Sequence, residues 1–90
     1  MSSQPLLTLE ALEKQLVMLI RERLLETPEG FGPESNLYDH GLDSMAIMQL
    51  LVLVENEFGV VIPEVDLTLQ NLSSSRLLAG LIIERRVRAA

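Results

Sequence analysis

The sequence predicts an all-α protein, an up-and-down four-helix bundle with three main helices, one short helix and a long first loop. Apolar residues recur at helical spacing in three segments, which are separated by stretches that contain proline and glycine. The chain has 90 residues, of which 48% are hydrophobic and 22% charged, a balance typical of a folded protein. We therefore expect a single domain over residues 1–90, with its core over about 8–86.

The first helix is expected to begin after Thr8, a good N-cap, and to stop at Thr27, because a residue before proline avoids helical angles. Its apolar stripe consists of Leu9, Leu12, Leu16, Ile20 and Leu24, with Glu10, Glu13, Lys14, Arg21 and Glu22 between them. Residues 28–42 then form a long connection, and loops of this length are usually functional or anchored by their own apolar residues. The candidate anchors are Phe31, Leu37 and Tyr38.

The second helix is expected to begin at Asp43 or Ser44 and to end near Phe58, where Gly59 offers a C-cap. Its core stripe consists of Ile47, Leu50, Leu51, Val54 and Phe58. A separate apolar face carries Met45, Met48 and Val52 and leans toward Ser44. This face is either an exposed docking surface or the contact of a short neighbouring helix, and the pattern favours neither.

The last third of the chain is expected to contain an extended connector, a short helical turn and a final helix. Val60, Val61 and Ile62 are β-branched and precede Pro63, which favours the connector. Residues 66–70 can form one short turn. Ser73 or Ser74 then caps a helix whose apolar residues are Leu77, Leu78, Leu81 and Ile82, with Arg85, Arg86 and Arg88 near its end.

Charge is distributed unevenly along a chain whose net charge is −6. No lysine or arginine lies between Arg23 and Arg76. That interval holds nine acidic residues: Glu26, Glu29, Glu34, Asp39, Asp43, Glu55, Glu57, Glu64 and Asp66. Such a field repels nucleic acid and anionic membranes and attracts basic protein surfaces, although an acidic surface also serves solubility alone. We expect no nucleic-acid or membrane partner.

The residue composition and the apolar pattern argue against metal sites, a catalytic triad, a membrane span and a secretory signal. The chain has no cysteine and one histidine, so thiolate and multi-histidine metal sites are not expected. No Gly-x-Ser-x-Gly elbow surrounds any serine, so a Ser-His-Asp set is not expected either. His40 is expected to cap or pack within the loop. No apolar run approaches the roughly 20 residues that span a bilayer, and residues 1–5 lack the pattern of a secretory signal. We expect a cytoplasmic protein that is not an enzyme.

One stretch, DHGLDSM at residues 39–45, indicates a functional site. It puts Ser44 in the first turn of an amphipathic helix, near free backbone N–H groups and the positive end of the helix, where a phosphate is well accommodated. No base accompanies this serine, so it is expected to be the substrate of another enzyme and not a nucleophile in its own reaction. The alternative is that Asp43 and Ser44 are an ordinary N-cap pair.

The motif GLDSM at residues 41–45, a helix that ends in ENEFG at 55–59, and the Ile62-Pro63 pair together resemble the acyl carrier protein superfamily, over roughly residues 8–86. In that superfamily the signature Gly-x-Asp-Ser-(Leu/Ile/Met) marks the attachment of 4′-phosphopantetheine. The resemblance implies an acyl-carrier-like bundle in which Ser44 receives the arm from coenzyme A and Asp43 caps the helix. The thiol of the arm then carries an acyl or aminoacyl group as a thioester.

The resemblance also implies the partners of the chain. These are a phosphopantetheinyl transferase, an adenylating acyl or aminoacyl ligase, and a downstream transferase or synthase, all of which meet a monomeric carrier. The implied docking residues are an apolar patch of Met45, Met48 and Val52 with an electrostatic rim of Asp39, Glu55 and Glu57. Contacts of this kind are expected to be small and transient.

The class of cargo is predicted from departures within the motif. Fatty-acid carriers typically have acids at the positions of Ala46 and Gln49, and peptide-synthetase carriers usually have Gly-Gly-Asp-Ser where this chain has Gly41-Leu42. The chain is more similar to stand-alone aminoacyl and D-alanyl carriers, and its near-native termini favour a discrete protein. A fatty-acid or polyketide synthase carrier is the first alternative. An unmodified helical interaction domain is the alternative from another class.

Overall fold

The computed structural model describes residues 8–89, with the side chains described up to residue 86. The remaining residues, including residues 1–5, in which no secretory signal is expected, lie outside the described part. The elements are α1 (Leu9–Arg23), η1 (Leu37–His40), α2 (Ser44–Phe58), η2 (Glu64–Asp66) and α3 (Ser75–Ala89), where η is a 3₁₀ turn. No strand occurs within residues 8–89, and the all-α prediction is confirmed.

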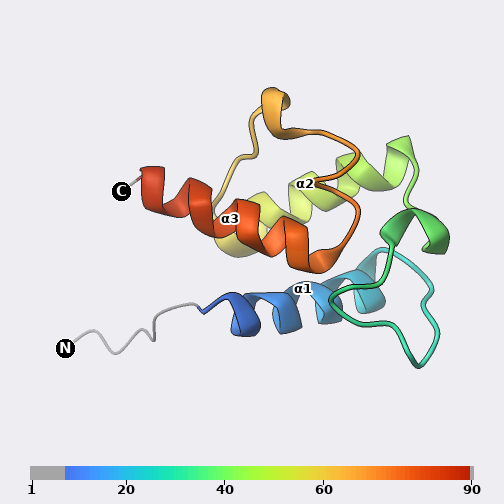
Figure 1. Cartoon of the computed structure of the whole chain (residues 1–90). Helices are drawn as coiled ribbons and strands as arrows, with labels where there is room; N and C mark the ends of the chain where they lie inside the picture. Colours follow the sequence, from blue (N-terminus) through green and yellow to red (C-terminus); the bar gives the residue numbers. More distant parts are fainter. Residues whose placement is uncertain (1–7, 90) are drawn as a thin grey trace.

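The three α-helices are arranged around a shared apolar core. α1 and α3 lie side by side with opposite chain directions, as Figure 1 shows. α2 and α3 run in the same general direction, as expected for the second and fourth helices of an up-and-down bundle whose short third helix lies between them (Figure 1). The connection over residues 59–74 is long enough to carry the chain back across the bundle before α3 begins.

α1 begins as predicted and ends earlier. The Thr8 hydroxyl accepts a hydrogen bond from the Ala11 amide at 3.1 Å, which confirms the N-cap. The helix ends at Arg23 because the amides of Leu24 and Leu25 both donate to the Ile20 carbonyl, at 3.0 and 2.8 Å. Of the predicted stripe, Leu12, Leu16 and Ile20 are buried, whereas Leu9 is exposed and Leu24 lies beyond the end of the helix.

The long connection before α2 is packed and hydrogen-bonded. Phe31 and Leu37 are buried and Tyr38 packs partly buried against the core, as predicted for its anchors. The turn η1 was not predicted; Asn36 Oδ1 starts it by accepting from the Tyr38 amide at 2.8 Å. The Leu37 amide also donates to the carbonyl of Ser73 at 2.8 Å. The loop is therefore held against the segment that precedes α3.

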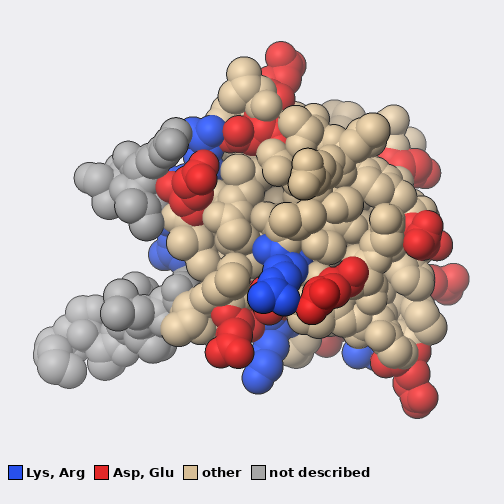
Figure 2. Space-filling model, in the orientation of Figure 1, with Lys and Arg blue, Asp and Glu red and all other residues tan. Residues whose placement is uncertain are grey.

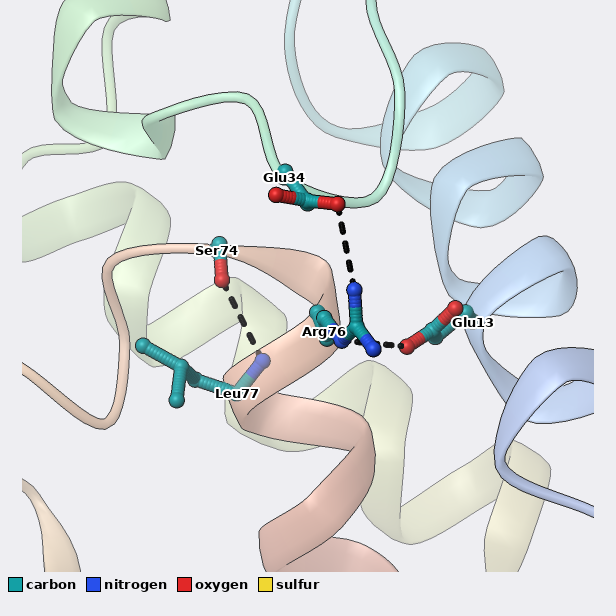
Figure 3. Close-up of polar contacts among 5 residues, drawn as sticks. All are labelled: Glu13, Glu34, Ser74, Arg76 and Leu77. Atoms are coloured by element: carbon teal, nitrogen blue, oxygen red, sulfur yellow. Dashed lines mark hydrogen bonds and ion pairs between the residues drawn. The ribbon is translucent and has the colours of Figure 1, made fainter.

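Arg76, at the start of α3, joins three elements. Its guanidinium lies between Glu34 of the loop, at 3.1 Å, and Glu13 of α1, at 3.5 Å (Figure 3). Glu13 was predicted on the polar face of α1 but is buried, and Arg76 supplies its opposite charge. Ser74 caps α3 by accepting from the Leu77 amide at 3.2 Å, which confirms one of the two predicted caps (Figure 3).

The short turn after α2 lies before the position predicted for it. It was expected over residues 66–70 and occurs at Glu64–Asp66. The cause is Pro63, whose carbonyl accepts from the Asp66 amide at 2.9 Å, so the turn begins directly after the proline. None of the described helices is long and apolar enough to cross a membrane.

Candidate functional site

Gly41 and Leu42 fix the chain immediately before Ser44. Gly41 ends η1 in the left-handed region, with a φ of 101°, a conformation that glycine adopts without the steric cost of a Cβ. Leu42 is buried in the core, and its amide donates to the Leu37 carbonyl at 3.1 Å. The glycine thus reverses the chain, and the leucine anchors it at the point where α2 begins.

Asp43 and Ser44 form the start of α2. The Asp43 carboxylate accepts from the Ala46 amide at 2.9 Å, so Asp43 is the N-cap. Ser44 is the first residue of the helix and is exposed. The first N–H groups of a helix have no carbonyl partner within it, and they give this end a partial positive charge. A phosphate esterified to the Ser44 hydroxyl would therefore lie in solvent beside a favourable field.

His40 packs within the loop that leads to α2. Its ring packs edge-on against the ring of Phe31, with centroids 5.2 Å apart and planes at 87°. The prediction that His40 packs within the loop is confirmed. Among the described residues, no cluster of three or more histidine, aspartate or glutamate side chains could hold a metal ion.

The second apolar face of α2 is open to solvent. Met45, Met48 and Val52 are exposed by 72, 69 and 55%, while Leu50 and Val54 are buried. No neighbouring helix within residues 8–86 covers this face, so the docking-surface interpretation is retained. Ala46, treated from the sequence as a neutral replacement beside the serine, is buried and faces the core. Only Gln49 of that pair is exposed.

The predicted acidic rim is exposed in the structure. Asp39 and Glu55 are exposed, and Glu57 is exposed but pairs with Arg23 at 3.2 Å. A pair this open to solvent contributes at most about 1 kcal/mol to stability. Figure 2 shows acidic side chains along the right-hand margin, the side on which α2 begins in Figure 1. A partner that approaches this end meets mainly negative charge.

Tyr38 links the site to the segment after η2, a contact that the sequence did not reveal. Its hydroxyl donates to the Leu69 carbonyl at 2.9 Å. Burial raises the pKa of the Tyr38 hydroxyl above its ordinary value. The sequence identified Tyr38 only as an apolar anchor of the loop, because nothing local indicates where a tyrosine hydroxyl finds its acceptor.

We expect the protein to lose stability at alkaline pH because of Tyr38. The pKa of Tyr38 is raised in the folded state. The contribution of Tyr38 to the free energy of unfolding is therefore complete below its pKa in the unfolded chain, about 10, and is lost as the pH rises through its pKa in the folded state. We expect Tyr38→Phe to lower the free energy of unfolding at pH 7 by about 1 kcal/mol or less. The difference between variant and wild type should shrink above about pH 10. Urea unfolding of both proteins from pH 7 to 11 measures the difference in free energy of unfolding and its change with pH. A difference that stays constant over this range would contradict the raised pKa of Tyr38.

Comparison with known proteins gives matches at the level of sequence. Residues 14–81 match the protein family described as phosphopantetheine attachment site. Aminoacyl carrier protein 2 of Bradyrhizobium diazoefficiens is 36% identical over 53 residues, which are 59% of this chain. The match covers 60% of that relative, so the chain spans less than two thirds of its length.

Two of the solved structures that are similar in fold are complexes of a glycine:[carrier protein] ligase. One is that of the Bradyrhizobium japonicum glycine:[carrier protein] ligase complexed with glycylated carrier protein, where a chain is 26% identical with a TM-score of 0.61; the match covers 81% of this chain and 96% of that one. The other is that of the engineered ligase with ATP and a carrier protein from Agrobacterium tumefaciens. Its matching chain is 24% identical to this one and gives a TM-score of 0.66. The match covers 86% of this chain and 99% of that chain.

Proposed function

We propose that this chain, which belongs to the phosphopantetheine attachment site family, is an aminoacyl carrier that holds its cargo on an arm attached to Ser44. The resemblance to carrier proteins expected from the sequence is confirmed by the family match. Members of this family carry a covalently attached 4′-phosphopantetheine. In this proposal the chain is the modified substrate of its partners and not a catalyst.

The observation that carries the site assignment is the exposed Ser44 at the first position of α2, inside the matched residues. Its hydroxyl oxygen would bond to the phosphorus that bears the pantetheine, the pyrophosphate bond of coenzyme A would break, and adenosine 3′,5′-bisphosphate would leave. The hydroxyl proton would pass to a group of the transferase, while His40 packs against Phe31. Asp43 keeps the helix start in place through its bond to the Ala46 amide. When attached, the arm supplies a thiol that bears the aminoacyl group as a thioester, so the absence of cysteine is no obstacle.

A sequence relative, a structural relative and the neutral side chain of Gln49 support the aminoacyl cargo. A sequence relative is an aminoacyl carrier protein, and one solved structural relative belongs to a complex with a glycine ligase. The exposed Gln49 is neutral where fatty-acid carriers typically have an acid. The proposed partners are therefore a phosphopantetheinyl transferase, an adenylating ligase that loads an amino acid, and a downstream transferase.

Intact mass spectrometry tests the proposal in two steps. The chain is first incubated with coenzyme A and a promiscuous phosphopantetheinyl transferase, and we expect the mass gain of one phosphopantetheine. No gain would favour the unmodified interaction domain. The modified chain is then offered to the B. japonicum glycine:[carrier protein] ligase with ATP and glycine, with a fatty-acid ligase and fatty acids in parallel. Loading with fatty acids alone would replace the aminoacyl cargo and retain the carrier.

Salt dependence is expected to be weak for the binding of the loading ligase. The centre of the proposed contact is apolar, and Glu57 of the rim already has a partner in Arg23. Salt screens exposed charge pairs and leaves apolar burial largely intact. We expect the affinity of the modified chain to fall only modestly between low and physiological salt, measured by calorimetry. A decline of about tenfold or more would mean that charge dominates the contact.

A further inference from the structure

The sulfur atoms of the described residues lie at the protein surface. The chain has four methionines and no cysteine. Met18, Met45 and Met48 fall within the described residues, and they are exposed by 57, 72 and 69%. The buried hydrophobic core of these residues consists of leucine, isoleucine, valine, alanine and phenylalanine. A reagent that attacks thioethers therefore changes the surface here and leaves the packed core intact.

Two of these methionines stand beside the proposed attachment site. Met45 follows Ser44 directly, and Met48 lies one helical turn after the serine. Together with Val52 they form the open face of α2. Met18 belongs to α1, a different helix. A small oxidant in solution can reach all three side chains, but only Met45 and Met48 belong to the proposed contact with partners.

The expected reaction is the oxidation of a thioether to a sulfoxide by a peroxide. A lone pair of the methionine sulfur attacks one oxygen of hydrogen peroxide, so that an S–O bond forms and the O–O bond breaks. The departing hydroxide takes the proton of the transferred hydroxyl group and leaves as water. The sulfur loses two electrons and the peroxide gains them. Methionine sulfoxide is reversible, because one reductase acts on each of its two epimers.

Oxidation of Met45 and Met48 has opposite consequences for folding and for docking. In the free protein both side chains are exposed, so the new oxygen atoms remain hydrated and the fold loses no packing. In a complex the polar oxygen would be desolvated against an apolar partner surface that offers it no hydrogen-bond donor. The modification therefore weakens binding without unfolding the chain.

We propose that Met45 and Met48 are reversible oxidation sites, and that their conversion to sulfoxides by a peroxide switches off docking of the loading ligase. The inference rests on the proposed function, since it concerns the same face of α2. Leucine at both positions would supply similar apolar volume and nothing to oxidise. The two thioethers thus make loading of the arm on Ser44 sensitive to peroxide, although the chain contains no cysteine.

Saturation kinetics of loading after oxidation test the proposal. The chain is treated with hydrogen peroxide before the arm is attached, because the thiol of the arm would react as well. Peptide mass mapping locates the added oxygen atoms, and an excess of transferase then attaches the phosphopantetheine, as checked by intact mass. With the B. japonicum glycine:[carrier protein] ligase, ATP and glycine, KM should rise about tenfold while kcat stays within about twofold. The melting temperature should change little.

The double variant Met45→Leu with Met48→Leu is the matched control, since it keeps Met18 and the apolar volume of the face. Its KM should equal that of the untreated wild type both before and after peroxide. Sulfoxide reductases for both epimers should return the oxidised wild type to its original KM.

Three outcomes would overturn the oxidation sites alone. These are an unchanged KM in the oxidised wild type, an equal rise in the double variant, and a KM that stays raised after reduction. Failure of the untreated wild-type chain to load would instead reject the aminoacyl function.

Discussion

Replacement of Ser44 by alanine is expected to abolish the gain of phosphopantetheine while leaving the fold intact. The N-cap of α2 is Asp43, whose carboxylate accepts from the Ala46 amide, so the serine hydroxyl is not needed to begin the helix. Alanine is the best helix former, and the free energy of unfolding should change by about 1 kcal/mol or less. Intact mass after incubation with coenzyme A and the transferase, together with thermal melting, measures both effects.

Ser73→Ala provides the control for Ser44→Ala. Ser73 donates its hydroxyl to the Gln70 carbonyl at 2.7 Å and lies outside the α2 start. This variant loses a hydroxyl of the same kind, and it should gain the same mass as the wild type. A Ser44→Ala chain that still gained a phosphopantetheine would place the attachment site elsewhere. The pair of variants separates loss of the attachment site from loss of a serine in general.

The start of α2 was predictable because its determinants are neighbours in the chain. A left-handed glycine, a buried leucine, a capping aspartate and an exposed serine act within residues 41–44, and each acts through its own backbone or through an amide a few residues away. The caps Thr8 and Ser74 were found for the same reason. Local backbone chemistry leaves a readable pattern in a single sequence.

Contacts between distant residues leave no such pattern. Glu13 was placed on the polar face of α1, but it is buried and pairs with Arg76, which is distant in the sequence. The bond from Tyr38 to Leu69 was likewise not foreseen. The path of residues 59–74 between α2 and α3 is also not determined by periodicity within a helix.

Ala46 is a residue that the sequence could have placed correctly. It precedes Leu50 and Val54 by steps of four residues, so all three share one face of α2, and all three are buried. From the sequence, Ala46 was compared only with the acid that fatty-acid carriers typically have at this position. The contrast with fatty-acid carriers therefore depends on Gln49, because a buried alanine says nothing about the charge that a partner meets.

Met48→Glu is expected to weaken loading strongly and to leave stability nearly unchanged. Met48 is 69% exposed, between Met45 and Val52 on the open face of α2, so a carboxylate there remains in water in the free protein. In a complex it would be desolvated against an apolar partner surface, a cost that the methionine does not carry. We expect the KM for loading of the phosphopantetheinylated chain to rise about tenfold or more, with the melting temperature little changed.

Two further variants, Leu50→Glu and Met48→Leu, are the controls for Met48→Glu. Leu50 is buried two residues further along, and a charge there should cost several kcal/mol and lower the melting temperature sharply. Met48→Leu keeps apolar volume and should load like the wild type. A tenfold effect is about 1.4 kcal/mol, close to the contribution of one buried apolar side chain, so a single contact suffices to produce it. A Met48→Glu chain that loads normally would remove this face of α2 from the docking surface, and one that melts like Leu50→Glu would assign Met48 to the core.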